Sequence, residues 1–377
     1  MRRLIPGLLA IGVAASAIAF FLWRARVNAE LAGRVGAIAT QVEHGTAVKG
    51  HPLPPGRSPK RCDVSNVLVE AVGLAPPLAR ADQEALEAFT AGPDAEGAAE
   101  VAPILRAWAP ALARWRDAAA CDTRGPLATP LDAAPLRLVL AARLADLRWR
   151  DDPAALTEGL EAWVAARELM NVGGLAEFVV AADLAADAAD AVEPTLLAPD
   201  LPDRIAQADG VAFVADHAAL LKDALARDVW RRSKQHLTEE TDDAARVRAV
   251  EREANTLGAW QLAAEEPDAA RAAGLRAIDP PPEVTDLPRG RVLAEAWTQV
   301  AGQERIANGL VLAAALTVFV EREGLCPRDL DAARPILPKE SWRDYRTAYL
   351  SWDESACALT VRGLDGGPLR VWVIETR

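Results

Sequence analysis

The sequence predicts a mainly α-helical protein with a single N-terminal transmembrane helix, a multi-helix soluble body and a small C-terminal antiparallel β-sheet packed on a long helix. Three observations predict this fold class. The chain opens with an uncharged run of twenty residues, 4–23. Apolar residues then recur at helical spacing through most of the sequence. Beyond residue 348, short segments alternate apolar and polar side chains, as strands do.

Residues 1–26 are predicted to form a transmembrane anchor. A helix rises 1.5 Å per residue, so residues 4–23 would span roughly 30 Å, the thickness of a bilayer's hydrocarbon core. Trp23 stands where interfacial aromatic residues occur. Arginines flank the apolar run on both sides: Arg2, Arg3, Arg24 and Arg26. The membrane is therefore the first predicted partner, through residues 4–23.

A cleaved signal peptide is the alternative interpretation of this segment. Two overlapping small-residue patterns, within 15–17 and 17–19, resemble a cleavage site. Cleavage there would leave an apolar segment ending in Trp23 at the new N-terminus, which favours an uncleaved signal-anchor. The flanking arginines are nearly balanced, so they orient the helix only weakly.

The four cysteines bear on the location of the body. All four lie on the soluble side of the anchor, and none belongs to a C-x-x-C motif. An even set of this kind is typical of disulfides formed in an oxidising compartment. We expect a cytoplasmic N-terminus and a periplasmic or extracellular body. The pairing expected is Cys62–Cys121 and Cys326–Cys357, because a proline-rich boundary separates the two pairs.

Composition limits the possible functions. The chain has 377 residues, of which 51% are hydrophobic and 25% charged, an ordinary globular composition. Its net charge of -12 argues against a nucleic-acid partner. Tryptophans within helical patterns are expected to fill the core; they are Trp108, Trp115, Trp149, Trp163, Trp230, Trp260 and Trp297.

The body is predicted to consist of successive helices. A juxtamembrane helix and a Pro/Gly-rich linker, 27–61, should precede an α-helical domain, 62–278. Thr129-Pro130 and Asp152-Pro153 each have the pattern of an N-cap followed by proline at the first helical position, and Pro135 could delay the regular start of the first of these helices by a turn. Pro110 should kink or split the helix that contains it. Helices are expected at 64–72, 81–90, 102–120, 130–149, 153–170, 211–232 and 239–263. Another helix is expected between Gly173-Gly174 and about residue 191.

The C-terminal part is predicted to combine one long helix with the sheet. A proline-rich linker, 279–290, precedes residues 291–377. The helix should cover 291–323, and its uncharged segment 306–320 is too short to span a bilayer comfortably, so we expect it to be buried nearly all round. Strands are expected at 348–352, 357–362 and 369–374, with Asp365-Gly366-Gly367 as the turn between the last two.

Candidate catalytic and metal-binding residues are few. Asp183, Asp187 and Asp190 form an acidic stripe at helical spacing, which could share a cation but is more typical of a solvated helix face. The four histidines have no mutual spacing that indicates a metal cluster: His44, His51, His217 and His236. His217 is expected near a buried face, and His236 in a polar connection, 234–241. Common hydrolase, nucleotide-binding and zinc-protease motifs are absent, so no catalytic residue and no cofactor are predicted.

One segment resembles a known family. Residues 319–330, Phe-Val-Glu-Arg-Glu-Gly-Leu-Cys-Pro-Arg-Asp-Leu, are followed by Pro335-Ile336-Leu337-Pro338 and by Tyr345. This segment resembles the helix followed by G-x-x-P-x-x-L in exported bacterial proteins such as the type II secretion pseudopilins. The resemblance covers about residues 291–377. It implies a long helix that meets a small antiparallel sheet, and it transfers no functional residues.

Two functions are compatible with the sequence. The first is a non-enzymatic, membrane-anchored envelope protein whose helical body binds a protein partner. The alternative is an envelope hydrolase or another enzyme with a noncontiguous site in the helical body. A deep pocket with converging titratable side chains would favour the enzyme, and a broad apolar groove would favour the scaffold.

Overall fold

The computed structural model describes residues 4–44, 60–196, 217–240, 242–266, 268–280, 288–336 and 349–374. The fold is mainly helical, as predicted, with a three-stranded antiparallel sheet near the C-terminus. The helices are α1 Leu4–His44, α2 Val64–Leu74, α3 Arg80–Ala91, α4 Ala95–Asp117, α5 Ala134–Trp149, α6 Ala154–Val172, α7 Leu175–Leu196, α9 His217–Glu239, α10 Asp243–Ala263, α11 Asp268–Arg276 and α12 Gly290–Glu323. The strands are β1 Lys60–Asp63, β2 Cys121–Thr123, β3 Leu350–Asp353, β4 Ala358–Arg362 and β5 Pro368–Val373.

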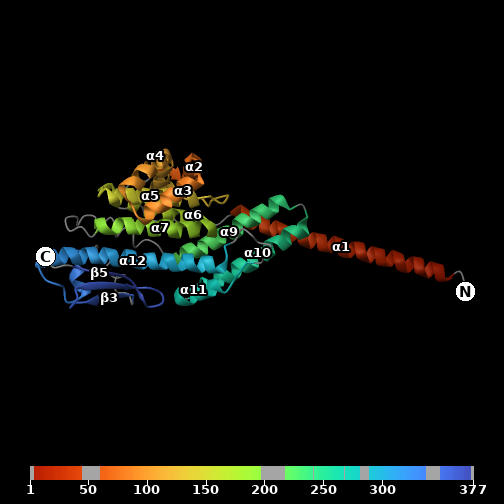
Figure 1. Cartoon of the computed structure of the whole chain (residues 1–377). Helices are drawn as coiled ribbons and strands as arrows, with labels where there is room; N and C mark the ends of the chain where they lie inside the picture. Colours follow the sequence, from red (N-terminus) through yellow and green to blue (C-terminus); the bar gives the residue numbers. More distant parts are fainter. Residues whose placement is uncertain are drawn as a thin grey trace.

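Helix α1 joins the predicted anchor to the predicted juxtamembrane helix without a break. Figure 1 shows that its first part projects away from the body, while its second part lies beside α9 and α10. Arg34 of α1 forms an ion pair with Glu251 of α10. The first part of α1 therefore extends from the body, and its second part packs on the α9–α10 hairpin.

The transmembrane helix remains a prediction. Among the described residues, one helix, α12, is long and apolar enough to cross a membrane. Of its most apolar stretch, 65% is buried inside the protein, as in the core helix of a folded domain. Residues 19–40 of α1 do not form such a span, because charged residues such as Arg24, Arg26 and Glu30 interrupt them.

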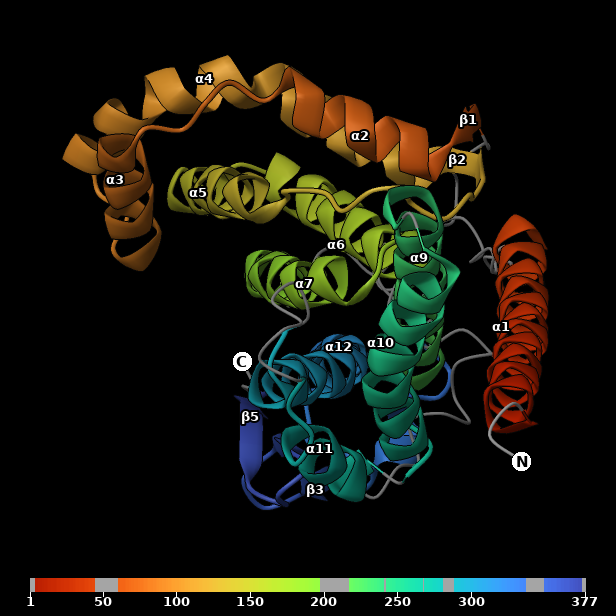
Figure 2. The same cartoon turned by 90° about the vertical axis from the view of Figure 1, so that its right-hand side faces the viewer.

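The body consists of stacked helical layers around one core. In Figure 1, α2, α3 and α4 lie at one end, α5, α6 and α7 beneath them, and α12 and the C-terminal sheet follow. Figure 2 shows the α9–α10 hairpin crossing the side of this stack nearest to α1. A continuous cluster of buried apolar residues extends from Val64 of α2 to Ile374 after β5. The segments on both sides of the predicted linker 279–290 therefore share the core.

Tryptophans supply much of that core, with two departures from the prediction. Trp108, Trp115, Trp163, Trp260 and Trp297 are buried. Trp149 is 44% exposed, so its predicted core position is wrong. It is the last residue of α5, where the chain turns away from the core. Trp230 is half-buried, and the ammonium group of Lys234 lies 5.5 Å from its ring.

Aspartates define several helix starts. The carboxylates of Asp63, Asp94, Asp152 and Asp242 accept hydrogen bonds from backbone N–H groups in the first turns of α2, α4, α6 and α10. Such contacts satisfy donors that have no partner inside the helix. Helix α5 begins at Ala134, after the Thr129-Pro130 pair at which the sequence predicted its start. Helix α11 was not predicted from the sequence.

Helix α4 is not split at Pro110, contrary to one of the predicted outcomes. It continues through both Pro103 and Pro110. A proline inside a helix costs about 3 kcal/mol or more. The buried face of α4, which includes Leu105, Trp108 and Leu112, packs into the core on either side of Pro110 and offsets that cost.

The C-terminal sheet packs on α12 as predicted. Strand β4 lies between β3 and β5, and both pairings are antiparallel. Gly366 has a φ of 81° in the turn between β4 and β5, a conformation that glycine adopts without a Cβ clash. Gly309 of α12 allows the sheet to approach closely, because a Cβ there would overlap Val361 and lie 2.8 Å from Trp372. Residues 306–320 are mostly buried, also as predicted.

Candidate functional site

The α9–α10 hairpin is held in place by a buried ion network at the junction of α6 and α7. Arg231 of α9 donates hydrogen bonds to the two carboxylate oxygens of Glu177 on α7, at 3.1 and 3.2 Å. Arg231 also pairs with Asp228, one turn earlier on α9. Glu177 is fully buried and Asp228 is 3% exposed. The network therefore fixes the register of α9 against α7.

Backbone donors complete this network. Glu177 accepts hydrogen bonds from the N–H groups of Leu131 and Gly174, both at 2.8 Å. Burial acts to raise the pKa of Glu177, but the charge and hydrogen bonds of Arg231, with these two N–H groups, outweigh burial and hold that pKa below its usual value. Burial likewise acts to lower the pKa of Arg231, and Asp228 and Glu177 reverse the effect. Both groups stay charged in the protein interior.

A second buried arginine anchors α9 to the end of α6. Arg227 Nε donates to the carbonyl oxygen of Gly173 at 2.5 Å, and Nη2 to that of Met170 at 2.6 Å. These carbonyls lie at the C-terminal end of α6, where helical carbonyls lack partners and the helix dipole favours a cation. Burial lowers the pKa of Arg227 to about 10, so it remains protonated at neutral pH.

A pocket of about 290 Å3 lies between the C-terminal turns of α9 and the first half of α10. Its lining is mostly polar and includes cationic and anionic side chains. The lining residues are His236, Glu240, Ala245, Arg248, Ala249, Arg252 and Glu253. This α9–α10 pocket is our candidate functional site.

His236 and Glu253 face each other in this pocket. His236 Nε2 lies 3.2 Å from Glu253 Oε1, although without the alignment of a hydrogen bond. Glu253 also lies 3.5 Å from Arg232 Nη1. His236 therefore lies inside α9 and has a carboxylate neighbour, so its predicted place in the polar connection 234–241 is wrong. The helix continues to Glu239 because Gln235 and Thr238 bond within it.

Two arginines line the pocket. Arg248 and Arg252 are exposed and form no ion pair with any carboxylate of the described residues. By contrast, Arg246 on the same helix donates hydrogen bonds to the Asp243 carboxylate at 3.1 Å and to the Glu240 carbonyl oxygen at 2.7 Å. The pocket therefore presents two guanidinium groups whose charge is not neutralised by a close carboxylate.

The predicted acidic stripe on α7 is paired with arginines. Arg137 of α5 lies 2.7 Å from Asp183 and 3.4 Å from Asp187, and both carboxylates are half-buried. Asp190 pairs with Arg370 of β5 at 2.8 Å. The interpretation as a solvated face therefore holds for Asp190, whose side chain is 57% exposed, whereas α5 partly covers Asp183 and Asp187. No group of three His, Cys, Asp or Glu side chains arranged for a metal ion occurs within the described ranges.

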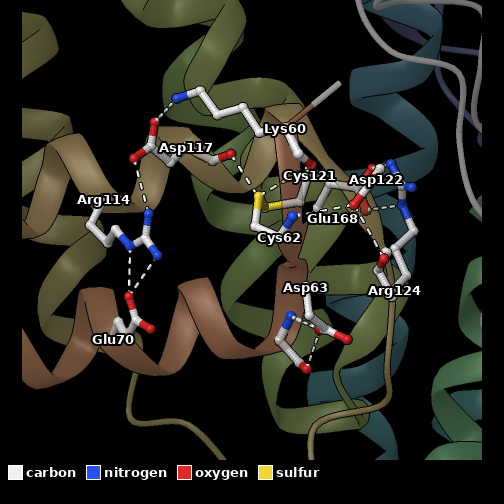
Figure 3. Close-up of a disulfide and its surroundings, with 12 residues drawn as sticks. Lys60, Cys62, Asp63, Glu70, Arg114, Asp117, Cys121, Asp122, Arg124 and Glu168 are labelled. Atoms are coloured by element: carbon white, nitrogen blue, oxygen red, sulfur yellow. Dashed lines mark hydrogen bonds and ion pairs between the residues drawn. A yellow bond between two sulfur atoms is a disulfide. The ribbon is translucent and has the colours of Figure 1, made fainter. Parts of the chain in front are cut away.

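The two disulfides have the predicted pairing, Cys62–Cys121 and Cys326–Cys357, with Cα–Cα distances of 4.9 and 5.8 Å. The first joins β1 to β2, a short parallel pair of strands that was not predicted from the sequence. Figure 3 shows the ion pairs around it. Lys60 contacts Asp117 at 2.5 Å, and Arg124 binds both carboxylate oxygens of Glu168 at 2.8 Å. This cluster ties the start of the body to α4 and α6.

The other three histidines are His44, His51 and His217. His44 ends α1, His51 lies outside the described residues, and His217 begins α9. The pocket itself was not predicted. Arg248 and Arg252 are one helical turn apart in the sequence, but their relation to His236 depends on how α9 and α10 pair.

Comparison with known proteins gave no relative. No protein-family model matches the chain, and no curated protein and no solved structure is detectably similar to it. The resemblance of residues 291–377 to pseudopilins therefore remains a prediction.

Proposed function

We propose that this protein is a membrane-anchored scaffold of the cell envelope, whose helical body binds a protein partner outside the cytoplasmic membrane. The observation that carries this proposal is the form of α1, a single helix from Leu4 to His44 that projects from the body. Four consecutive apolar side chains on it are more than half exposed: Phe20, Phe21, Leu22 and Trp23. Insertion of residues 4–23 into a bilayer would remove such side chains from water.

The second part of α1 acts as a stalk in this proposal. Residues 24–44 would extend roughly 30 Å beyond the hydrocarbon core, at 1.5 Å per residue. Contacts with α9 and α10, including the Arg34–Glu251 ion pair, connect the stalk to the body. The buried Glu177–Arg231 network then connects the hairpin to the core. The body would be held at a defined height above the membrane.

The disulfides support a body outside the cytoplasm, because such bonds persist in oxidising compartments. The test of anchoring is alkaline carbonate extraction of native membranes, followed by N-terminal sequencing. We expect the full chain to stay in the membrane pellet with Met1 or Arg2 at its start. A soluble protein that begins at Ile18 or Phe20 would refute the anchor.

Partner binding is tested separately by site-specific photocrosslinking in intact cells. Exposed apolar positions offer sites for the crosslinker: Val69 and Leu74 on α2, and Val371 and Val373 on β5. We expect at least one position to give a discrete adduct with another envelope protein. The exposed polar position Arg80 serves as the control. Absence of adducts at all apolar positions, with normal membrane localisation, would refute the scaffold function and leave the anchor intact.

The enzyme alternative is favoured by one observation, the His236–Glu253 pair beside two arginines in the α9–α10 pocket. A histidine near a carboxylate is a common arrangement for proton transfer. The test is a screen of the purified full chain and its His236→Ala variant for hydrolysis of ester and phosphoester substrates. Turnover that requires His236 would establish the enzyme.

A further inference from the structure

We propose that the α9–α10 pocket binds a phosphate group. This inference goes beyond the scaffold function and does not depend on the membrane anchor. Its basis is the pair Arg248 and Arg252, which lie one turn apart on α10 and line the same pocket. Side chains at this spacing are neighbours on a helix, with Cβ atoms about 5–6 Å apart. Two guanidinium groups can then bind the same phosphate through charge-assisted hydrogen bonds.

The charge balance within the pocket favours an anion. Glu253 is already contacted by His236 at 3.2 Å and by Arg232 at 3.5 Å. Glu240 is the other carboxylate in the lining. Together with Arg232, which contacts Glu253 from outside the lining, Arg248 and Arg252 place three guanidinium groups beside the two carboxylates of the lining. Guanidinium groups that outnumber the carboxylates around a pocket attract anions to it.

Nearby acidic side chains at the hairpin are occupied by other contacts. Asp242 accepts from the Ala245 N–H at 3.0 Å as the cap of α10, and Asp243 pairs with Arg246 at 3.1 Å. Glu239 accepts hydrogen bonds from Gln235 at 3.1 Å. None of these contacts involves Arg248 or Arg252, so both guanidinium groups remain available to a ligand.

Arg248 and Arg252 would contact only the phosphate group of a ligand. The same chemistry would suit a soluble phosphate compound or the phosphate of a lipid headgroup. The experiment below distinguishes these two sources.

The test is modification of arginines by phenylglyoxal, read by mass spectrometry of the full chain. In a phosphate-free detergent, Arg248 and Arg252 should react readily. Inorganic pyrophosphate at about ten times its dissociation constant should slow their modification about tenfold, because only the unoccupied protein reacts. Arg106 on α4 and Arg148 on α5 are exposed and form no ion pair with the described carboxylates, so their modification should not change.

A lipid arm repeats the measurement in nanodiscs without added pyrophosphate. Phosphatidylglycerol in the nanodisc should protect the same two arginines if a headgroup is the ligand, and pyrophosphate alone should protect them if the ligand is soluble. Either pattern supports the site. Equal protection of all four arginines, or protection of none in both arms, would overturn it.

Variants provide an independent readout. Their binding is measured by calorimetric titration with whichever ligand protected the arginines, pyrophosphate or phosphatidylglycerol. R248Q/R252Q should weaken binding by at least about a hundredfold, since two sets of charge-assisted hydrogen bonds to the ligand are lost. R106Q/R148Q removes the same charge elsewhere and should bind as the unmodified chain does. Equal loss in the two double variants would show a general charge effect and overturn the site.

Discussion

Replacement of Arg231 by methionine tests whether the buried network fixes the α9–α10 hairpin. Methionine keeps much of the side-chain volume and removes the cation between Glu177 and Asp228. The two carboxylates are 0% and 3% exposed, so water cannot replace the lost partner. Removal of one member of a buried ion pair typically costs about 3–5 kcal/mol. That is a large part of the total stability of about 5–15 kcal/mol expected for a folded protein.

The pH dependence gives this prediction a sign. In the unchanged protein, the pKa of Glu177 is lower in the folded state than in the unfolded state. Its ionised carboxylate therefore stabilises the fold at pH values above the unfolded-state pKa. This stabilisation is lost as the pH falls through the folded-state pKa. Without Arg231, burial dominates and should raise the pKa of Glu177 above its unfolded value. In the folded variant, the ionised form of Glu177 is then less favourable than its protonated form at pH values where it would be ionised in the unfolded chain. The loss of stability caused by R231M should therefore be larger at about pH 7 than at about pH 4.

The assay is urea unfolding of the full chain in a mild detergent, followed by tryptophan fluorescence. Trp115 and Trp260 are fully buried and should report the loss of the core. R80M is the matched control, because Arg80 forms an exposed pair with Glu84 that is expected to contribute within about 0–1 kcal/mol. In the double variant R231M/E177Q, removal of the buried charge should recover part of the loss. A cost for R231M below about 1 kcal/mol, or one equal at both pH values, would refute this reasoning.

Three further predictions concern separate parts of the fold. C62A/C121A should destabilise the body by about 4 kcal/mol in the chain-entropy estimate, and peptide mapping of unreduced protein checks the Cys62–Cys121 pairing itself. G309A should lower the free energy of unfolding by about 1–3 kcal/mol, because the added Cβ would overlap the sheet. G258A, at a position on α10 with open space, should raise that free energy by up to about 1 kcal/mol. Urea unfolding measures both changes. Burial raises the pKa of Asp187 to about 6 despite Arg137, so the contribution of this carboxyl to stability should fall as pH rises from about 4 to about 6. When unfolding of both proteins is measured, the stability of the wild type relative to D187N should fall over the same range.

The sequence determined most of the helical layout. Helical periodicity from residue 62 onward predicted the main helices of the body, because an amphipathic face is a local property of the chain. Alternating side chains and the Asp365-Gly366-Gly367 turn predicted the C-terminal hairpin. Cysteine positions on either side of a proline-rich segment were enough to predict the disulfide pairing.

Tertiary structure alone decided the polar sites. Arg137 meets Asp183 only because α5 packs beside α7, and His236 meets Glu253 only because α9 and α10 form a hairpin. The partner of Arg231 on α7 is more than fifty residues away in the sequence. A single sequence shows which residues can be charged, but ion pairs and pockets depend on distances between segments that no local pattern encodes. Periodicity is carried by each helix by itself, whereas a site between helices exists only after they have packed.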